Sequence, residues 1–269
     1  MASLSMIETQ FKSLQFLAND TQIQSPDYGT IPLDFLIIGD THPCPYLPNK
    51  RATEQVFIAF EFSPELYHDF MDHGFRRSGN LFYRPICEEC QECRAIRIRN
   101  RNFLPSKSQR RTLRKNQDLK VTIGPPQFTE EKFRIFRDYL KFQHDSAQDD
   151  SVENFRDHLY VSPIMTLEFE YRMRERLVAV SIADICSRSF SSVYAYFDPE
   201  FSERSLGTFS ALWEIQFCRA RGIPYYYIGF YIRDCPSMRY KARFRPYEIL
   251  IPEHIWKPMD HSGIDVSGT

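Results

Sequence analysis

The sequence has no long uninterrupted run of apolar residues, which excludes a transmembrane helix of ordinary length. Residues 1–16 carry Glu8 and Lys12 among scattered apolar side chains and lack the continuous apolar core of a secretory signal. The formal net charge is only −1, which excludes a protein that meets nucleic acid through overall positive charge. We therefore expect a cytoplasmic protein with no membrane partner, in which any nucleic-acid contact comes from a local basic patch.

Internal repeats and low-complexity blocks are also lacking, and 42% of the 269 residues are hydrophobic. This length and composition indicate a globular chain of one large domain or two small ones. The clearest internal break is the run that begins Gly124-Pro, where we place a boundary between two modules. The predicted division is an N-terminal extension over 1–32, a cysteine-containing module over 33–124, a second module over 125–256 and a polar tail over 257–269.

Ahead of that break, apolar patterning predicts strands over 33–38, 54–62 and 95–101. Ser63 is placed to cap a helix whose first turn contains Pro64. Isoleucines and arginines alternate in the strand over 95–101, so two isoleucines would be buried on one face. The opposite face would display Arg97, Arg99 and Arg101.

After the break, Thr129 is placed to cap a helix. Three consecutive strands are then predicted over 164–171, 176–185 and 190–197, followed by a helix over 206–221 and a strand over 225–232. Three sequential strands indicate an antiparallel meander, and the helical crossover indicates a parallel neighbour. The predicted fold class is α+β, with a mixed, mostly antiparallel sheet flanked by helices.

Three of the seven cysteines are crowded into two overlapping CxxC spacings, at Cys87, Cys90 and Cys93. This short spacing lets two thiolates reach one tetrahedral centre, and Cys44, between two prolines, is the candidate fourth ligand. A structural zinc ion or an iron–sulfur cluster would both suit this donor set. The alternative is a group of reduced surface thiols near a turn.

The segment 94–115 contains nine Lys or Arg residues and no Asp or Glu. Ser, Gln and Arg side chains are concentrated in its densest part, and they are common phosphate contacts. We interpret the segment as a surface for RNA or another polyanion, with a solvated helix face as the alternative. The candidate contacts are Lys107, Arg110, Arg111 and Arg114.

A second candidate site follows the strand that ends near Asp198 and Pro199. Arg204, Gly207 and Thr208 lead from there into a helix, and such a start suits a phosphate or an acyl carbonyl. The arrangement resembles the acyl-CoA N-acetyltransferases, but Phe209 occupies the place of their last small residue, which favours a different acyl donor. Farther along, Tyr240 and Lys241 are hard to explain as packing residues.

Together these segments resemble the arginyl/leucyl-tRNA–protein transferase family, and in particular its bacterial branch, the aspartate/glutamate leucyltransferases. The resemblance covers about 33–250, and its matching pieces are 42–48, 74–78, 83–93, 106–111, 196–199, 204–209 and 228–246. It implies a GNAT-like acyltransferase fold with an N-terminal cysteine-containing module and a catalytic module over 125–256. It also implies transfer of leucine from leucyl-tRNA to proteins beginning with Asp or Glu, which marks them for degradation in a bacterial N-degron pathway.

An aminoacyl ester is already activated, so we expect direct attack by the acceptor amine with no cofactor required. The predicted catalytic residues are Asp198, Tyr240 and Lys241, and the predicted donor loop is Arg204, Gly207 and Thr208. The predicted acceptor-binding residues are Arg76, Arg77, Tyr83 and Arg84. Asp198 has an alternative role as a turn residue ahead of Pro199, and Lys241 with Tyr240 forms an alternative acceptor pocket.

Three alternatives stay open at the level of sequence. The donor could be arginyl-tRNA, because Asp234-Cys-Pro-Ser is closer to the eukaryotic arginyltransferase form. The chain could be a CoA-dependent N-acetyltransferase on the same fold, although the CoA glycines are incomplete. It could also be a non-catalytic tRNA-binding protein built on the basic stretch and the cysteines.

Overall fold

The computed structural model of the chain describes residues 36–143, 151–252 and 254–259. Its centre is an eight-stranded sheet in the order β14-β13-β7-β12-β11-β10-β9-β8. All neighbours are antiparallel except β11 and β12, which are parallel. The strands are β7 (Arg94–Arg99), β8 (Leu119–Gly124), β9 (Thr166–Met173), β10 (Arg176–Ile185), β11 (Ser189–Phe197), β12 (Tyr225–Tyr231), β13 (Tyr247–Leu250) and β14 (Trp256–Met259).

The meander and the crossover predicted from the sequence are confirmed. Strands β9, β10 and β11 pair in sequence order, and α6 (Leu206–Ala220) then carries the chain to the parallel strand β12. Strands β8, β13 and β14 and helix α5 (Val152–Leu159) were not predicted, because their apolar patterns are short.

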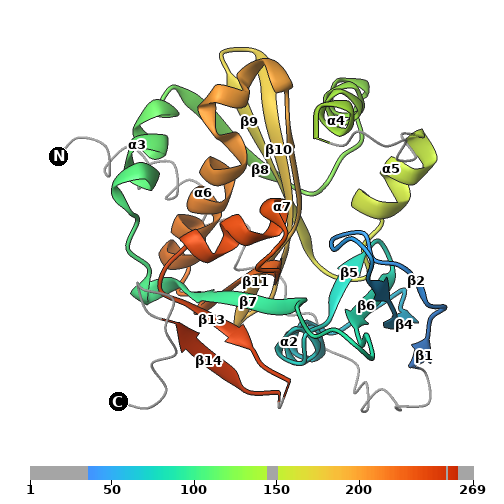
Figure 1. The fold of residues 1–269 in the computed structure, drawn as a ribbon. Coiled ribbons are helices and arrows are strands. Elements are labelled where there is room, and N and C mark those ends of the chain that lie inside the picture. Colours follow the sequence, from blue (N-terminus) through green and yellow to red (C-terminus); the bar gives the residue numbers. More distant parts are fainter. Residues whose placement is uncertain (1–35, 144–150, 253, 260–269) are drawn as a thin grey trace.

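Helices cover both faces of the large sheet (Figure 1). Helices α3 (Lys107–Lys115) and α6 lie together on one face, while α4 (Glu130–Gln143) and α5 lie on the other. The short elements are η3 (Asn100–Asn102), η4 (Pro199–Arg204), α7 (Pro236–Arg239) and η5 (Tyr240–Arg243). In the described part of the chain, no helix combines the length and apolar character needed to cross a membrane.

A second, four-stranded sheet lies beside the large one in the order β1-β4-β6-β5 (Figure 1). Helix α2 (Pro64–Asp72) begins as predicted, with the Ser63 side chain accepting a hydrogen bond from the Leu66 amide. The strands are β1 (Ile37–Ile38), β4 (Glu54–Ile58), β5 (Arg76–Ser78) and β6 (Leu81–Pro85), and a separate hairpin pairs β2 (His42–Pro43) with β3 (Arg51–Ala52). The Phe82 ring stacks on the rings of Phe57 and Phe62, and these three rings form the core of this unit.

The predicted modules share a sheet. Strands β7 and β8 belong to the predicted module over 33–124, yet both lie in the large sheet with the strands that follow Gly124. The end of β14 extends to Met259, so residues 257–259 of the predicted polar tail form an edge strand. The predicted extension over 1–32 lies outside the described residues.

Arg77 joins the small sheet to the large one. Its guanidinium is buried and makes a two-pronged ion pair with Asp184 on β10. The hydroxyls of Tyr67 and Thr166 donate to the same carboxylate, at 2.7 and 2.8 Å. Both oxygens of Asp184 therefore accept hydrogen bonds, Oδ1 from Arg77 and Thr166 and Oδ2 from Arg77 and Tyr67, as a buried charge requires.

Arg97 makes a second connection, between α2 and the large sheet. It pairs with Asp72 and Glu248, and its guanidinium lies 4.2 Å from the Tyr225 ring and 4.1 Å from the Trp256 ring. The prediction that this strand displays all three of its arginines is therefore wrong for Arg97, which two carboxylates and two rings enclose. Arg99 and Arg101 are exposed as predicted.

We expect Arg77→Met to lower the free energy of unfolding by about 3–5 kcal/mol, because it leaves Asp184 buried without its cation. Urea unfolding followed by circular dichroism measures the change. The matched control is Arg176→Met, which removes the half-exposed ion pair with Asp198 and should shift the midpoint little. Equal midpoint shifts in the two variants would contradict the role assigned to the buried pair.

Candidate active site

The parallel strands β11 and β12 pair over only three positions, which join 189–191 to 225–227. Beyond them β11 continues along β10 to Phe197, while β12 continues along β7 to Tyr231 after a shift in register. Gly229 lies in that shift with a φ of 100°, a conformation that favours glycine. The two strands therefore separate, and we call the space between their diverging ends the strand opening.

Lys241 points its ammonium into the strand opening. The residue lies on η5 and is 9% exposed, and a methyl group added to Gly229 would lie 2.9 Å from its Nζ. Burial, together with the positive charge of Arg76, lowers the pKa of Lys241 to about 7. Among the described residues no carboxylate pairs with it, and its Nζ donates only to the Met238 sulfur at 3.1 Å. Lys241 is thus positioned to change charge near neutral pH.

Arg76 reaches the same opening from β5. Its side chain is buried and donates to the carbonyl oxygen of Ser192, one residue past the last paired residue of β11. Its Nη1 is buried and has no hydrogen-bond partner among the described residues. Two cations therefore meet at the strand opening without an opposing carboxylate, an arrangement that suits a substrate carrying negative charge.

Tyr83 and Tyr46 border this centre. Tyr83 is paired with Arg76 across β5 and β6, and burial raises its pKa. Tyr46 follows the β2 strand, and burial raises its pKa, with further contributions from Tyr83 and Cys93. Sequence reasoning placed Tyr83 in the acceptor pocket but missed Tyr46, which lay only in a matching segment without a predicted role.

Glu214 is a further residue that sequence reasoning missed. It lies in α6 with 1% exposure, and the Tyr226 hydroxyl donates to its Oε2 at 2.7 Å. Burial raises its pKa to about 7, and hydrogen bonds from Ser181, Tyr226 and Ser192 oppose that rise. The contact with Ser192 brings this carboxyl next to the strand opening. The signal in the sequence was a single acid in an otherwise apolar stretch of helix.

The four predicted metal ligands surround one small cavity. Cys44, Cys87, Cys90 and Cys93 line a space of about 70 Å³ together with Tyr46 and Tyr83. Burial, together with the other three thiols, raises the pKa of Cys93 to about 12. All four side chains are free thiols. Within the described residues, however, no three metal-binding side chains lie close enough together to hold an ion.

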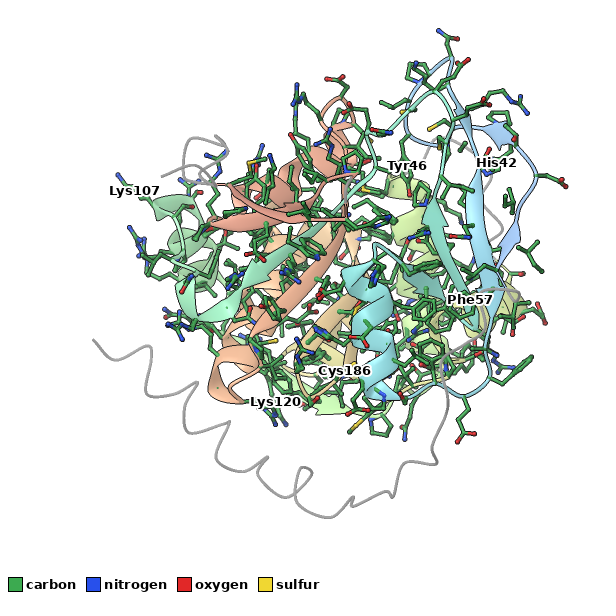
Figure 2. All side chains as sticks on the ribbon, turned by 90° about the horizontal axis from the view of Figure 1, so that it is seen from below. His42, Tyr46, Phe57, Lys107, Lys120 and Cys186 are labelled. Carbon is green, nitrogen blue, oxygen red and sulfur yellow. The ribbon has the colours of Figure 1, made fainter. Side chains whose placement is uncertain are left out.

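The predicted tRNA-binding residues lie on one exposed helix. Lys107, Arg110, Arg111 and Arg114 all project from α3, which begins with a capping box between Ser106 and Gln109. The other end of α3 reaches the predicted donor loop, where Asn116 donates to the Arg204 carbonyl oxygen at 2.9 Å. Lys107 and Tyr46 lie on different sides of the molecule (Figure 2).

The donor loop itself starts α6. Ser205 has a left-handed conformation and its side chain does not cap the helix, so the first amides of α6 have no side-chain acceptor from it. A methyl group added to Gly207 would meet nothing within 4 Å, which leaves open space above this turn. Arg204 does not face that space, because it pairs with Asp118 at 2.8 Å. Thr208 is half-buried in the first turn.

Two predicted site residues serve the fold. Asp198 accepts a hydrogen bond from the Glu200 amide at 3.1 Å and pairs with Arg176 at 2.6 Å, so its carboxylate holds the turn before η4. Arg77 is buried and pairs with Asp184. These contacts give both residues a structural role, and the catalytic role of Asp198 and the acceptor role of Arg77 stay predictions.

The remaining predicted residues divide between two places. Tyr240 adjoins Lys241, and burial raises its pKa to about 12, with Tyr139 and Glu214 adding to the rise. Arg84 lines a second, larger cavity of about 280 Å³. The structure therefore brings together Arg76, Tyr83, Tyr240 and Lys241, and separates them from Arg84 and from the basic face of α3.

Known proteins match the chain along most of its length. The family model for the N terminus of arginine-tRNA-protein transferase matches residues 42–111, and the model for its C terminus matches residues 131–251. An aspartate/glutamate leucyltransferase of Hahella chejuensis is 35% identical over 78% of this chain and 91% of that protein. Its counterpart from Pseudomonas putida is 37% identical over the same shares.

Among solved structures, the C-terminal domain of a lysylphosphatidylglycerol synthetase from Agrobacterium fabrum aligns with a TM-score of 0.45 and 12% identity. The alignment covers 76% of this chain and 65% of that domain's chain, and a likeness this weak carries no argument. The sequence matches are decisive, because the two family models together cover the four cysteines, the first half of α3 and the strands of the strand opening, and the leucyltransferases match most of the chain. The chain belongs to the arginine-tRNA-protein transferase family.

Proposed function

We propose that the chain transfers leucine from leucyl-tRNA to the N-terminal Asp or Glu of acceptor proteins, in the cytoplasm, and so marks them for degradation. The named relatives support this activity and this donor. The observation that carries the proposal is the meeting of Arg76 and Lys241 at the strand opening, without a carboxylate partner among the described residues. A site of this charge suits an ester whose carbonyl oxygen becomes negative during attack.

The donor side of the proposal rests on the diverging parallel strands and the helix that follows. A GNAT-like acyltransferase fold is supported by the order meander, crossover helix and parallel strand, with a gap where the strands diverge. The acceptor stem of the tRNA would lie along α3, whose far end is fastened to the start of α6. The uncapped amides of α6 would then face the charged end of the tRNA.

The chemistry needs one proton transfer and no covalent enzyme intermediate. The acceptor α-amine attacks the ester carbonyl, and neutral Lys241 takes the proton that the amine loses. Arg76 stabilises the negative charge that forms on the carbonyl oxygen. As the intermediate collapses, the C–O bond to the ribose breaks and Lys241 returns the proton to the leaving hydroxyl. Tyr240 and Tyr83 would orient the reacting groups.

The four cysteines remain the candidate donors for zinc or an iron–sulfur cluster. Their shared cavity supports the idea, although no three of the thiols lie close enough together to hold one ion. No step of the proposed transfer depends on such a group, since the ester is already activated. A bound metal would supply rigidity to the loop that carries Cys93 and Arg94.

Two rival functions have weaker support. A CoA-dependent N-acetyltransferase would need small residues at the start of α6, where Phe209 is buried instead. A non-catalytic tRNA-binding protein would explain α3 but leaves the two cations at the strand opening without a purpose. Arginyl-tRNA as donor on the same acceptors remains the alternative within the family, whose models are named for that reaction.

A donor-by-acceptor grid tests the function directly. We expect the protein to move radiolabelled leucine from leucyl-tRNA onto peptides that begin with Asp or Glu, and not onto peptides that begin with Lys or Ala. Transfer from arginyl-tRNA alone would show that arginyl-tRNA, and not leucyl-tRNA, is the donor. Absence of transfer from either tRNA, or tight binding of acetyl-CoA in calorimetry, would sink the proposal.

The role of Lys241 predicts a pH dependence. Because its pKa is lowered to about 7, Lys241 is charged below that pH and neutral above it, so the transfer rate should rise as the pH increases through about 7. Lys241→Arg keeps the charge but cannot become neutral, and we expect a loss of roughly 100-fold or more. The remaining pH dependence of the Lys241→Arg variant should follow only the acceptor amine, whose pKa is about 8.

Initial rates of leucine transfer across the neutral range measure this dependence. Lys120→Arg on β8 is the matched control, because Lys120 is exposed and should give wild-type rates (Figure 2). A Lys241→Arg variant with the wild-type rate and profile would show that a fixed positive charge suffices, and the base assignment would fail.

The basic face of α3 predicts a salt dependence. Removing two phosphate contacts with Arg110→Ala/Arg111→Ala should weaken leucyl-tRNA binding and reduce the slope of log K against log salt by roughly 1–2. Filter binding over a salt series measures the slope. Arg134→Ala/Lys141→Ala on α4 removes the same charge from the opposite face of the sheet and should leave the slope unchanged. An unchanged slope in the α3 variant would show that the tRNA binds to another surface of the protein.

A further inference from the structure

The cavity beside the cysteines has no role in the proton transfer described above. It measures about 280 Å³ and lies where the ends of β6, β7, β12 and β13 meet. Its charged and titratable lining consists of Arg84, Arg94, His73 and His254, with the three cysteines of the CxxC loop. The described residues that line it include no Asp or Glu. We call it the arginine cavity.

Arg84 is held in place but not neutralised. Its Nε donates to the Gln55 side chain at 2.8 Å, its Nη1 donates to the His73 carbonyl oxygen at 3.2 Å, and its guanidinium lies 4.8 Å from the Phe75 ring. These neutral partners leave Nη2 without a partner among the described residues. Burial lowers the pKa of Arg84, so the site holds a cation at a desolvation cost. An arginine fixed in this way is preorganised for an anion.

Arg94 supplies the second guanidinium. It is the first residue of β7 and lines the same cavity, and within the described residues its side chain makes no hydrogen bond or ion pair. By contrast Arg97 and Arg99, farther along β7, both pair with Glu248. The chain therefore neutralises two arginines of this strand and leaves the one beside the cavity free.

The rest of the lining limits the kind of anion. Phe230, Leu250, Ile251 and Pro252 form an apolar wall, which suits a carbon stem rather than a bare ion. The volume lies just below the roughly 300–1,000 Å³ of ordinary ligand pockets, which favours a small ligand. A short side chain or a small metabolite that ends in a carboxylate or a phosphate fits the size and the charge.

We propose that the arginine cavity binds a small organic anion, a carboxylate or phosphate on a short carbon stem, through Arg84 and Arg94. Its position favours the acidic side chain of the acceptor protein. Phe230 lines the cavity, and the preceding residue, Gly229, contacts Lys241. A side chain held here would belong to a residue whose α-amine lies near the strand opening. To that extent the inference deepens the proposed function, by naming which arginines receive the acceptor.

Direct binding tests the cavity without charged tRNA. Calorimetry of the full chain is run with a peptide beginning with Glu, with the matched peptide beginning with Gln, and with free glycerol 3-phosphate. We expect the Glu peptide to bind more tightly than the Gln peptide. Arg94→Gln and Arg84→Gln should each weaken it roughly 10- to 100-fold, the loss expected for a charge-assisted hydrogen bond. The matched control is Arg101→Gln, since Arg101 is exposed beyond the opposite end of β7 and should bind normally.

The outcomes separate the two sources of the anion. Weakened peptide binding, with a raised KM for the Glu peptide in transfer, assigns the cavity to the acceptor. Weakened binding of glycerol 3-phosphate alone assigns it to a free metabolite. If both variants bind every probe as Arg101→Gln does, the proposal is overturned. A protein that shows the expected binding but transfers no leucine would refute the proposed function and leave this inference standing.

Discussion

The geometry of the active site depends on the buried ion pair between Arg77 and Asp184. The pair ties β5 of the small sheet to β10 of the large one, and Asp184 is itself the cross-strand partner of Ser191. Arg76 is the neighbour of Arg77 on β5, and it reaches Ser192, the neighbour of Ser191 on β11. Consecutive residues of β5 thus meet two neighbouring strands of the large sheet, Arg77 at β10 and Arg76 at β11. The buried pair thus helps to hold the Arg76 charge at the point where β11 separates from β12.

The elements that position the site follow from local sequence, and the contacts that define it do not. Ser63 and Thr129 cap their helices through contacts with residues three positions away, and the apolar residues of β10 are contiguous, so caps and strands could be predicted from the chain alone. Arg77 and Asp184 lie 107 positions apart, and Arg97 and Glu248 lie 151 positions apart. A run of arginines carries no sign of which members will meet a carboxylate. For that reason Arg76 and Arg77 were predicted to share one role.

The same limit explains the residues that were missed or misassigned. Arg94 was counted in a basic stretch with the residues of α3, although it lies at the start of β7 and faces the arginine cavity. Asp198 looked catalytic because it ends a strand ahead of the donor loop, yet Arg176 and the Glu200 amide satisfy it. Glu214 is a single acid in an apolar helix, and only its burial and its hydrogen bond with Ser192 show that it lies next to the strand opening. What distinguishes functional from structural charge here is the absence of a partner, and partners are properties of the fold.

The positions of the unpaired cations also explain how an enzyme with a lysine base can take an acidic acceptor. A substrate carboxylate placed against Lys241 would favour its charged form and raise its pKa, which would remove the base that the acceptor amine requires. Arg76 acts in the opposite direction, since its fixed charge helps to keep Lys241 neutral near pH 7. An acidic acceptor is therefore compatible with a lysine base only if other cations, away from Lys241, neutralise the carboxylate of the acceptor. Arg84 and Arg94 line the arginine cavity, whereas the Lys241 Nζ approaches Gly229 at the strand opening, and this difference in place offers that separation. On this argument, specificity for acidic acceptors and proton transfer use different cations, and the register shift at Gly229 keeps them apart.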